Sequence, residues 1–234
     1  MTAEAPDAAA SRYRAVRDRL DAACRDAGRA PEDVVLVGAS KRQPIERLRG
    51  AYEAGLRVFG ENLVQEGEAK LPRMPDDCEW HLLGPLQSNK VKKAARVFST
   101  IHAIDRLKIG RALDREAGRL GTRIDGFLEV NLGDEPSKHG FVPSELAGQV
   151  AELAPLEHLR IVGLMAIPPF EPDMGRARAW FDRLRELRDE LAARPEWSGF
   201  PGWLSMGMSH DFAAAIAAGA THVRVGTALF GERP

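Results

Sequence analysis

The sequence predicts an α/β fold in which eight parallel strands close into one (β/α)8, or TIM-like, barrel with an additional N-terminal helix. Apolar runs of strand length alternate with segments of helical period, and eight such runs occur along the chain. A length of 234 residues suits one barrel, and no internal repeat or linker-like tract interrupts it. We therefore expect residues 1–234 to form a single domain, with an open, doubly wound sheet as the alternative.

The elements are expected in regular alternation. A first amphipathic helix covers roughly residues 8–27, and strands are expected near 34–40, 57–60, 79–84, 99–104, 125–132, 159–167, 202–206 and 221–226. Helices between them are predicted at 44–54, 89–97, 107–120, 144–153, 176–193 and 210–218. Pro44 fits a first helical turn, and Gly55 and Gly219 fit helix C-termini. Little sequence follows the last strand, so we expect the N-terminal helix to take the place of an eighth outer helix.

Composition excludes several classes of function. The formal net charge is −1, which provides no field to gather nucleic acid or an anionic membrane surface. No apolar run approaches the roughly 20 residues that span a bilayer, and the first residues are acidic, unlike a signal peptide. We expect a cytoplasmic protein with neither nucleic-acid nor membrane partners. Cys24 and Cys78 are far apart and are expected to stay free.

Lys41 is the first candidate functional residue. It follows the apolar run Val34-Val35-Leu36-Val37-Gly38-Ala39-Ser40, at the end of a strand where barrel enzymes place their active sites. Burial disfavours the charged form of an amine and lowers its pKa, so the neutral nucleophile needed for Schiff-base chemistry becomes available. The alternative is a solvated lysine at a strand end.

Arg224 and the segments around it supply a second signal. In a closed barrel the first and last strands are neighbours, so Arg224 and Lys41 are expected to face the same interior space, whereas Val223 and Val225 point toward the helices. Gly226-Thr227 and the loop Ser205-Met206-Gly207-Met208-Ser209 follow the last two strands, where many barrels bind phosphate. An amine, a cationic donor and a phosphate cradle together suit pyridoxal 5′-phosphate (PLP). A buried salt bridge for Arg224 and plain turn chemistry for the glycines are the alternatives.

Three histidines fall on three different predicted strands: His81, His102 and His222. A metal site would require all three to lie at one depth, and no further ligand supports it. We therefore expect core histidines and no metal.

Six ordered motifs resemble one known family. They are Val37-Gly38-Ala39-Ser40-Lys41, Phe59-Gly60-Glu61-Asn62, His81-Leu82-Leu83-Gly84-Pro85-Leu86-Gln87-Ser88-Asn89-Lys90, Gly163-Leu164-Met165-Ala166-Ile167-Pro168, Leu204-Ser205-Met206-Gly207-Met208-Ser209 and Val223-Arg224-Val225-Gly226-Thr227. Together they are similar to the pyridoxal-phosphate homeostasis protein family (YggS/PROSC type). The resemblance implies a monomeric barrel of the alanine-racemase N-terminal-domain type that holds PLP as a Schiff base. It also implies a role in vitamin B6 balance and in supplying PLP, possible recipients being apo PLP-dependent enzymes.

The resemblance also implies roles for individual residues. Lys41 would form the Schiff base, Arg224 would face the pyridine nitrogen, and Asn62 would lie beside the ring. The phosphate would be held by Ser205, Gly226 and Thr227, with Met206 and Ser209 close by. Lys138 falls where the family often has a second lysine near the site, a candidate for cofactor transfer or regulation.

The residues favour a carrier over a catalyst. A guanidinium has only donors, so Arg224 favours an unprotonated pyridine and a weak electron sink. Racemisation needs a second acid or base opposite the first, and the only tyrosines, Tyr13 and Tyr52, fall in predicted helices. We predict a PLP-binding protein with little or no turnover. A PLP-dependent amino-acid racemase of low activity and a cofactor-free barrel aldolase or phosphosugar enzyme remain as alternatives.

Overall fold

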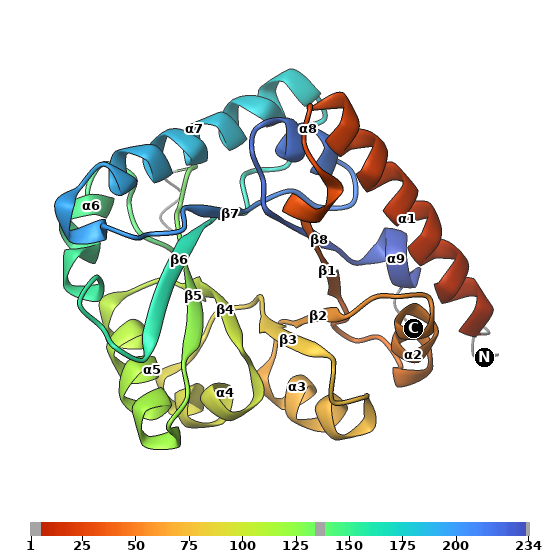
Figure 1. Ribbon diagram of the computed structural model, residues 1–234, viewed down its shortest axis with the longest axis horizontal. Helices are drawn as coiled ribbons and strands as arrows, with labels where there is room; N and C mark the ends of the chain where they lie inside the picture. Colours follow the sequence, from red (N-terminus) through yellow and green to blue (C-terminus); the bar gives the residue numbers. More distant parts are fainter. Residues whose placement is uncertain (1–5, 134–138, 233–234) are drawn as a thin grey trace.

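The computed structural model describes residues 6–133 and 139–232, and it confirms the predicted barrel. Parallel strands pair in chain order, and the last pairs with the first through Val35 opposite His222 and Gly38 opposite Val225 (Figure 1). This pairing closes the sheet and overturns the open-sheet alternative. The strands are β1 (Val35–Ala39), β2 (Val58–Glu61), β3 (Glu79–Leu82), β4 (Thr100–Ile104), β5 (Ile124–Glu129), β6 (Leu159–Met165), β7 (Trp203–Ser205) and β8 (His222–Val225).

Helices surround the barrel and mostly match the predicted ranges. The α-helices are α1 (Pro6–Asp26), α2 (Ile45–Glu53), α3 (Val64–Lys70), α4 (Val91–Val97), α5 (Leu107–Leu120), α6 (Leu146–Val150), α7 (Met174–Ala192), α8 (Phe212–Ala217) and α9 (Thr227–Phe230). Short 3₁₀ helices are η1 (Pro31–Asp33), η2 (Leu71–Arg73), η3 (Ser88–Lys90), η4 (Ala151–Leu153) and η5 (Pro195–Trp197). Helix α3 was not among the expected helices, and the segment predicted as one helix at 144–153 is α6 followed by η4.

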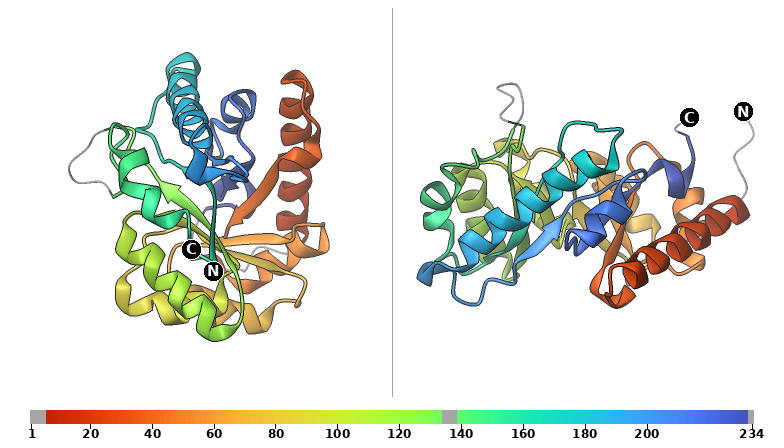
Figure 2. Two further views of the ribbon diagram at one scale, coloured as in Figure 1. Left: turned by 60° about the vertical axis from the view of Figure 1, so that its left-hand side comes forward. Right: turned by 90° about the horizontal axis from the view of Figure 1, so that it is seen from above.

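Helix α1 occupies the place that the chain leaves open after β8. Helix α9 has only four residues, and α1 packs against α2, α8 and α9 along that side of the barrel (Figures 1 and 2). Val16, Leu20 and Cys24 form the buried face of α1, each no more than 2% exposed. The predicted role of the N-terminal helix is therefore confirmed.

The barrel has two packing regions. A large apolar cluster fills the space between strands and helices and includes Val223 and Val225. Inside the strands, a smaller cluster around Phe127 and Met165 shares the space with the three histidines, and His102 stacks on Phe127 with ring centroids 4.5 Å apart. The predicted orientation of β8 is confirmed, and so are the predicted core histidines, since His81, His102 and His222 are 2%, 0% and 5% exposed.

Several smaller expectations are also settled. Tyr13 lies in α1 and Tyr52 in α2, and Cys24 and Cys78 are free thiols. Among the residues described, no helix combines the length and the apolar character that crossing a membrane requires.

Candidate functional site

A cavity of about 170 Å³ lies at the C-terminal ends of the strands, where β1, β2, β3, β6, β7 and β8 deliver residues to one space. It brings together six of the predicted site residues: Lys41, Asn62, Ser209, Arg224, Gly226 and Thr227. Residues that the prediction missed complete the lining: Ala39, Gln43, Leu83, Ile167 and Met208. Ala39, Leu83, Ile167 and Met208 lie within four of the six motifs, and Gln43 follows another motif residue by two positions, so strand-end position was the available signal.

The turn that carries Lys41 is held on both sides. The Ser40 hydroxyl donates to Glu61 Oε1 at 2.6 Å, and Lys70 Nζ donates to the Ser40 carbonyl at 2.8 Å. On the other side, Arg42 has a left-handed backbone with φ of 57°, and its N–H donates to Glu66 Oε2 at 2.8 Å. These bonds on both neighbours of Lys41 fix the direction in which its side chain leaves the strand.

Glu61 and Lys70 form a buried pair beneath this turn. Lys70 Nζ lies 2.7 Å from Glu61 Oε1, with side-chain exposures of 12% and 0%. Burial raises the pKa of Glu61, while the hydrogen bonds from Lys70 and Ser40 act in the opposite direction. The carboxylate thus depends on these two donors to remain in the interior.

Arg224 stands inside the barrel below the cavity and is 6% exposed. Its Nη1 donates to Ser205 Oγ at 2.5 Å and its Nη2 to the Ala166 carbonyl at 2.9 Å. Burial lowers the pKa of the guanidinium to about 10, so it remains protonated at neutral pH. Arg224 is therefore a fixed cationic donor at the edge of the cavity.

The loops after β7 and β8 approach the cavity with their backbones. Gly207 has φ of 91°, and a Cβ there would lie 3.0 Å from Phe212 Cα, so only glycine fits this turn. A Cβ at Gly226 would lie 3.3 Å from the Ala39 carbonyl oxygen. In α9 the N–H groups of Leu229 and Phe230 donate to the Gly226 carbonyl, whereas those of Thr227 and Ala228 come before the first intrahelical hydrogen bond. Both loops therefore leave room and donors for an anionic group.

Three predicted site residues are not placed at the cavity. Ser205 and Met206 do not line it, and both are fully buried. The Ser205 hydroxyl is engaged by Arg224 and by His102 Nδ1, which is 2.7 Å away. Lys138 lies outside the described residues.

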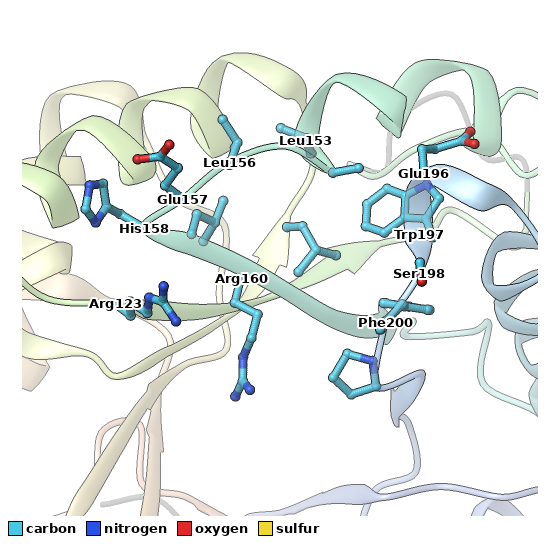
Figure 3. Close-up of a pocket in the computed structure, with 15 residues that line it drawn as sticks. Arg123, Leu153, Leu156, Glu157, His158, Arg160, Glu196, Trp197, Ser198 and Phe200 are labelled. Atoms are coloured by element: carbon cyan, nitrogen blue, oxygen red, sulfur yellow. The ribbon is translucent and has the colours of Figure 1, made fainter.

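A second cavity does not bring predicted site residues together. It has a volume of about 400 Å³ and lies beside the start of β6 and η5, and its lining includes Arg160 and Trp197 (Figure 3). None of the predicted site residues lines it. Within residues 6–133 and 139–232, no group of three His, Cys, Asp or Glu side chains is placed to hold a metal ion.

Comparison with known proteins gives the same assignment as the motifs. The family described as alanine racemase, N-terminal domain, matches residues 14–234. A pyridoxal phosphate homeostasis protein of Aquifex aeolicus (strain VF5) is 42% identical over 226 residues, covering 96% of this chain and 98% of its own. The protein of that name from Escherichia coli (strain K12) is 40% identical over 222 residues, with coverages of 93% and 94%.

Solved structures agree with the observed fold. PipY of Synechococcus elongatus PCC7942 with PLP bound has a TM-score of 0.83 and 39% identity, over 95% of this chain and all of that chain (100%). An alanine racemase of Clostridium difficile 630 has a TM-score of 0.74 at 16% identity, over 96% of this chain and 57% of its own, which is a likeness of fold alone. The chain thus belongs to the pyridoxal phosphate homeostasis protein family, within the wider family of alanine racemase N-terminal domains.

Proposed function

We propose that this protein binds PLP in the cavity at the C-terminal face of the barrel, as a Schiff base on Lys41. Its role is intracellular PLP homeostasis and supply, with little or no catalytic turnover. Relatives at about 40% identity carry the name of this function, and PipY, at 39% identity, has a structure with PLP bound.

The residues present fit the cofactor. The cavity offers a primary amine from Lys41, a donor-only cation from Arg224, and glycine-lined backbone beside Ser209 and Thr227. When bound, PLP supplies an aldehyde that condenses with a primary amine and releases water. An amine and a phosphate cradle on the two neighbouring strands β1 and β8 suit a molecule that carries an aldehyde and a phosphate.

Each residue has a distinct task in this proposal. Lys41 provides the amine, and Arg224 faces the pyridine nitrogen, which it keeps unprotonated because a guanidinium donates hydrogen bonds and accepts none. Ser209, Gly226 and Thr227 hold the phosphate, and Asn62 lies beside the ring. Met206 lies buried next to the loop that follows β7. The Ser205 hydroxyl accepts a hydrogen bond from Arg224 and so positions Arg224 rather than the phosphate.

One observation favours a carrier over an enzyme. Among the described residues that line the cavity, Lys41 and Arg224 are the only titratable side chains, and Arg224 retains its proton at neutral pH. Neither tyrosine approaches the cavity, since the Tyr52 hydroxyl donates to Asp77 and Tyr13 packs against Gly55. Racemisation requires acid and base on opposite faces of a carbon, and this lining provides one such group.

The wider setting of the protein is part of the same proposal. We place it in the cytoplasm as a monomer, with apo PLP-dependent enzymes as recipients of the cofactor and Lys138 as a second lysine that assists transfer. These assignments rest on the family resemblance and on the balanced charge of the chain.

The visible absorbance spectrum of the purified protein tests the proposal first. We expect a yellow protein whose band bleaches on borohydride reduction, with the pyridoxyl mass on the peptide that contains Lys41. A protein that stays colourless when PLP is added would refute the proposal and favour the cofactor-free alternative. Turnover of amino-acid enantiomers that persists after free PLP is diluted away would refute the carrier role and support a racemase.

A further inference from the structure

A continuous series of polar side chains runs from Arg224 down the inside of the barrel. Arg224 Nη1 lies 2.5 Å from Ser205 Oγ, which lies 2.7 Å from His102 Nδ1. His102 Nε2 lies 3.0 Å from His81 Nδ1, and His81 Nε2 lies 3.7 Å from Glu79 Oε1. The series starts at the cavity of the proposed cofactor site and ends on the first residue of β3, at the opposite face of the barrel.

The inner members of this series are sealed from water. Ser205 and His102 have no exposed surface, and His81 is 2% exposed. The His102 ring is stacked on Phe127, which fixes its plane. A buried polar group without a partner is destabilising, so each of these groups relies on the next for its hydrogen bond.

Counting hydrogens fixes the direction of the series. Arg224 has only donors, so Ser205 Oγ accepts from it. If His102 also donated to Ser205, the serine hydroxyl hydrogen would have no acceptor, because Arg224 and His102 are the only partners of this oxygen among the residues described. Ser205 therefore donates to His102 Nδ1, His102 Nε2–H donates to His81 Nδ1, and His81 carries its hydrogen on Nε2.

The far end opens on a second polar cavity. His81 Nε2 is buried and has no hydrogen-bond partner in the described part of the chain, and the nearby Glu79 side chain is 54% exposed. A cavity of about 530 Å³ lies at this N-terminal mouth, and its charged or titratable lining residues are Arg29, Glu32, Asp33, Glu79, His81, Asp125 and His222. Because His81 carries its hydrogen on Nε2, this N–H faces the Glu79 carboxylate at the N-terminal mouth.

We propose that Ser205, His102 and His81 are positioning residues that form a one-way hydrogen-bond relay, holding Arg224 as a donor and linking the cofactor cavity to Glu79 at the opposite mouth. The inference rests on the proposed function, because it assigns Arg224 to the pyridine nitrogen. A relay of this kind keeps the Ser205 lone pair on Arg224, and a negative charge at its far end strengthens every bond along it. The strength of the Arg224 contact to the cofactor then depends on a residue outside the cofactor site.

The direction of the relay is tested without any cofactor. Histidine-ring ¹⁵N NMR on the apo protein reports which nitrogen carries the hydrogen. We expect the Nε2–H form at both His102 and His81, with each Nδ1 shifted as an acceptor. The Nδ1–H form at His102 would overturn the relay whether or not the protein binds PLP.

The link to the cofactor is tested by the pH at which the absorbance of the PLP-loaded protein changes. Glu79→Gln is expected to shift that midpoint by about 0.5 pH unit, because it removes the charge at the end of the relay. The matched control is Glu32→Gln, which removes the same charge from the same mouth but does not touch the relay. Equal shifts in the two variants would overturn the proposal, since a general field effect would then suffice.

A double-mutant cycle isolates the relay further. His81→Asn keeps an acceptor near the position of Nδ1 and loses the group that faces Glu79, so it should reproduce the Glu79→Gln shift. Combining both substitutions should add nothing further, because they break the same link. Additive shifts would contradict the relay. If the wild-type protein takes up no PLP, the proposed function fails, and the NMR experiment alone decides the relay.

Discussion

At the scale of single residues, burial determines which protonation state several titratable side chains adopt. Lys41 is half-buried at the cavity, and Arg224 is an interior cation whose lowered pKa of about 10 still leaves it charged. His222 shows the opposite outcome, because burial lowers its pKa to about 3 and the ring stays neutral in the folded protein. These differences give separate, measurable predictions.

Replacing Lys41 with alanine should abolish the borohydride-stable pyridoxyl adduct without unfolding the protein. The fold should tolerate the change because Ser40 and Arg42 hold the turn through bonds that this substitution leaves in place. Mass spectrometry of the reduced protein measures the adduct, and circular dichroism measures the fold. The exposed Lys92→Ala serves as the control and should keep the full adduct. An undiminished adduct in Lys41→Ala would contradict the assignment.

Acid should destabilise the protein partly through His222. Its pKa falls from 6.5 in the unfolded chain to about 3 when folded, so the unfolded chain binds the extra proton between these values. Stability attributable to this group is present above pH 6.5 and is lost as the pH falls toward 3. His222→Met should remove about 2 kcal/mol of the loss in unfolding free energy between pH 7 and pH 5. Urea titrations at both pH values measure it, with the half-buried His158→Gln as control; an unchanged pH dependence would rule His222 out as a source.

At the scale of elements, the strand ends were more predictable than the helices. The alternation of apolar runs located all eight strands, and the motifs at their C-terminal ends contain ten of the eleven residues that line the cavity, six of which were predicted as site residues. Helix α3 escaped prediction because it is short and buries only Val64 and Gly67, too few positions for a helical period. The family resemblance implied Ser205 at the phosphate, and its position in the sequence does not reveal that its hydroxyl is bonded to Arg224 and His102 inside the barrel.

The loop after β3 supports the loop after β2 by direct backbone contact. A Cβ at Gly84 would lie 2.4 Å from the Asn62 carbonyl oxygen and 2.9 Å from Asn62 Cα. Gly84→Ala should therefore displace Asn62 in the cavity, weaken PLP binding, and lower the unfolding free energy by about 1–3 kcal/mol. PLP titration and urea denaturation measure the two effects.

Gly148→Ala is the matched control for this substitution. Gly148 lies in α6, and an added Cβ there meets nothing within 4 Å. It should leave PLP binding unchanged and stabilise the helix by up to about 1 kcal/mol. If Gly84→Ala behaved like this control, close backbone contact would not be what positions Asn62.

At the scale of the whole molecule, α1 completes the outer layer of the barrel. Leu20 lies on its buried face with no exposed surface, and the helix covers the region between α8 and α2 (Figure 1). Leu20→Ala should cost about 2–5 kcal/mol of unfolding free energy through lost burial and a residual cavity. The exposed Asp18→Ala on the same helix should change it by less than about 0.5 kcal/mol. Equal stability of the two variants, measured by urea unfolding, would show that α1 is not part of the cooperative fold.

The barrel could be predicted from the sequence because eight strand segments that alternate with helical segments over 234 residues are compatible with very few folds. It could not reach the interior relay, because the contacts of His81, His102 and Ser205 join strands that are distant in sequence and depend on register. The cavities of about 400 Å³ and 530 Å³ could not be predicted for the same reason, because the segments that line each of them become neighbours only in the closed barrel.

The pairing of β1 with β8 also determines when this fold can be completed. During synthesis, β1 leaves the ribosome before the other seven strands and has no partner on one side until β8 has also emerged. Contacts between such distant segments slow folding, and unpaired strand edges expose nascent chains to aggregation. Lys41 and Arg224 are carried by these two strands, so the site forms only when the last strand closes the barrel.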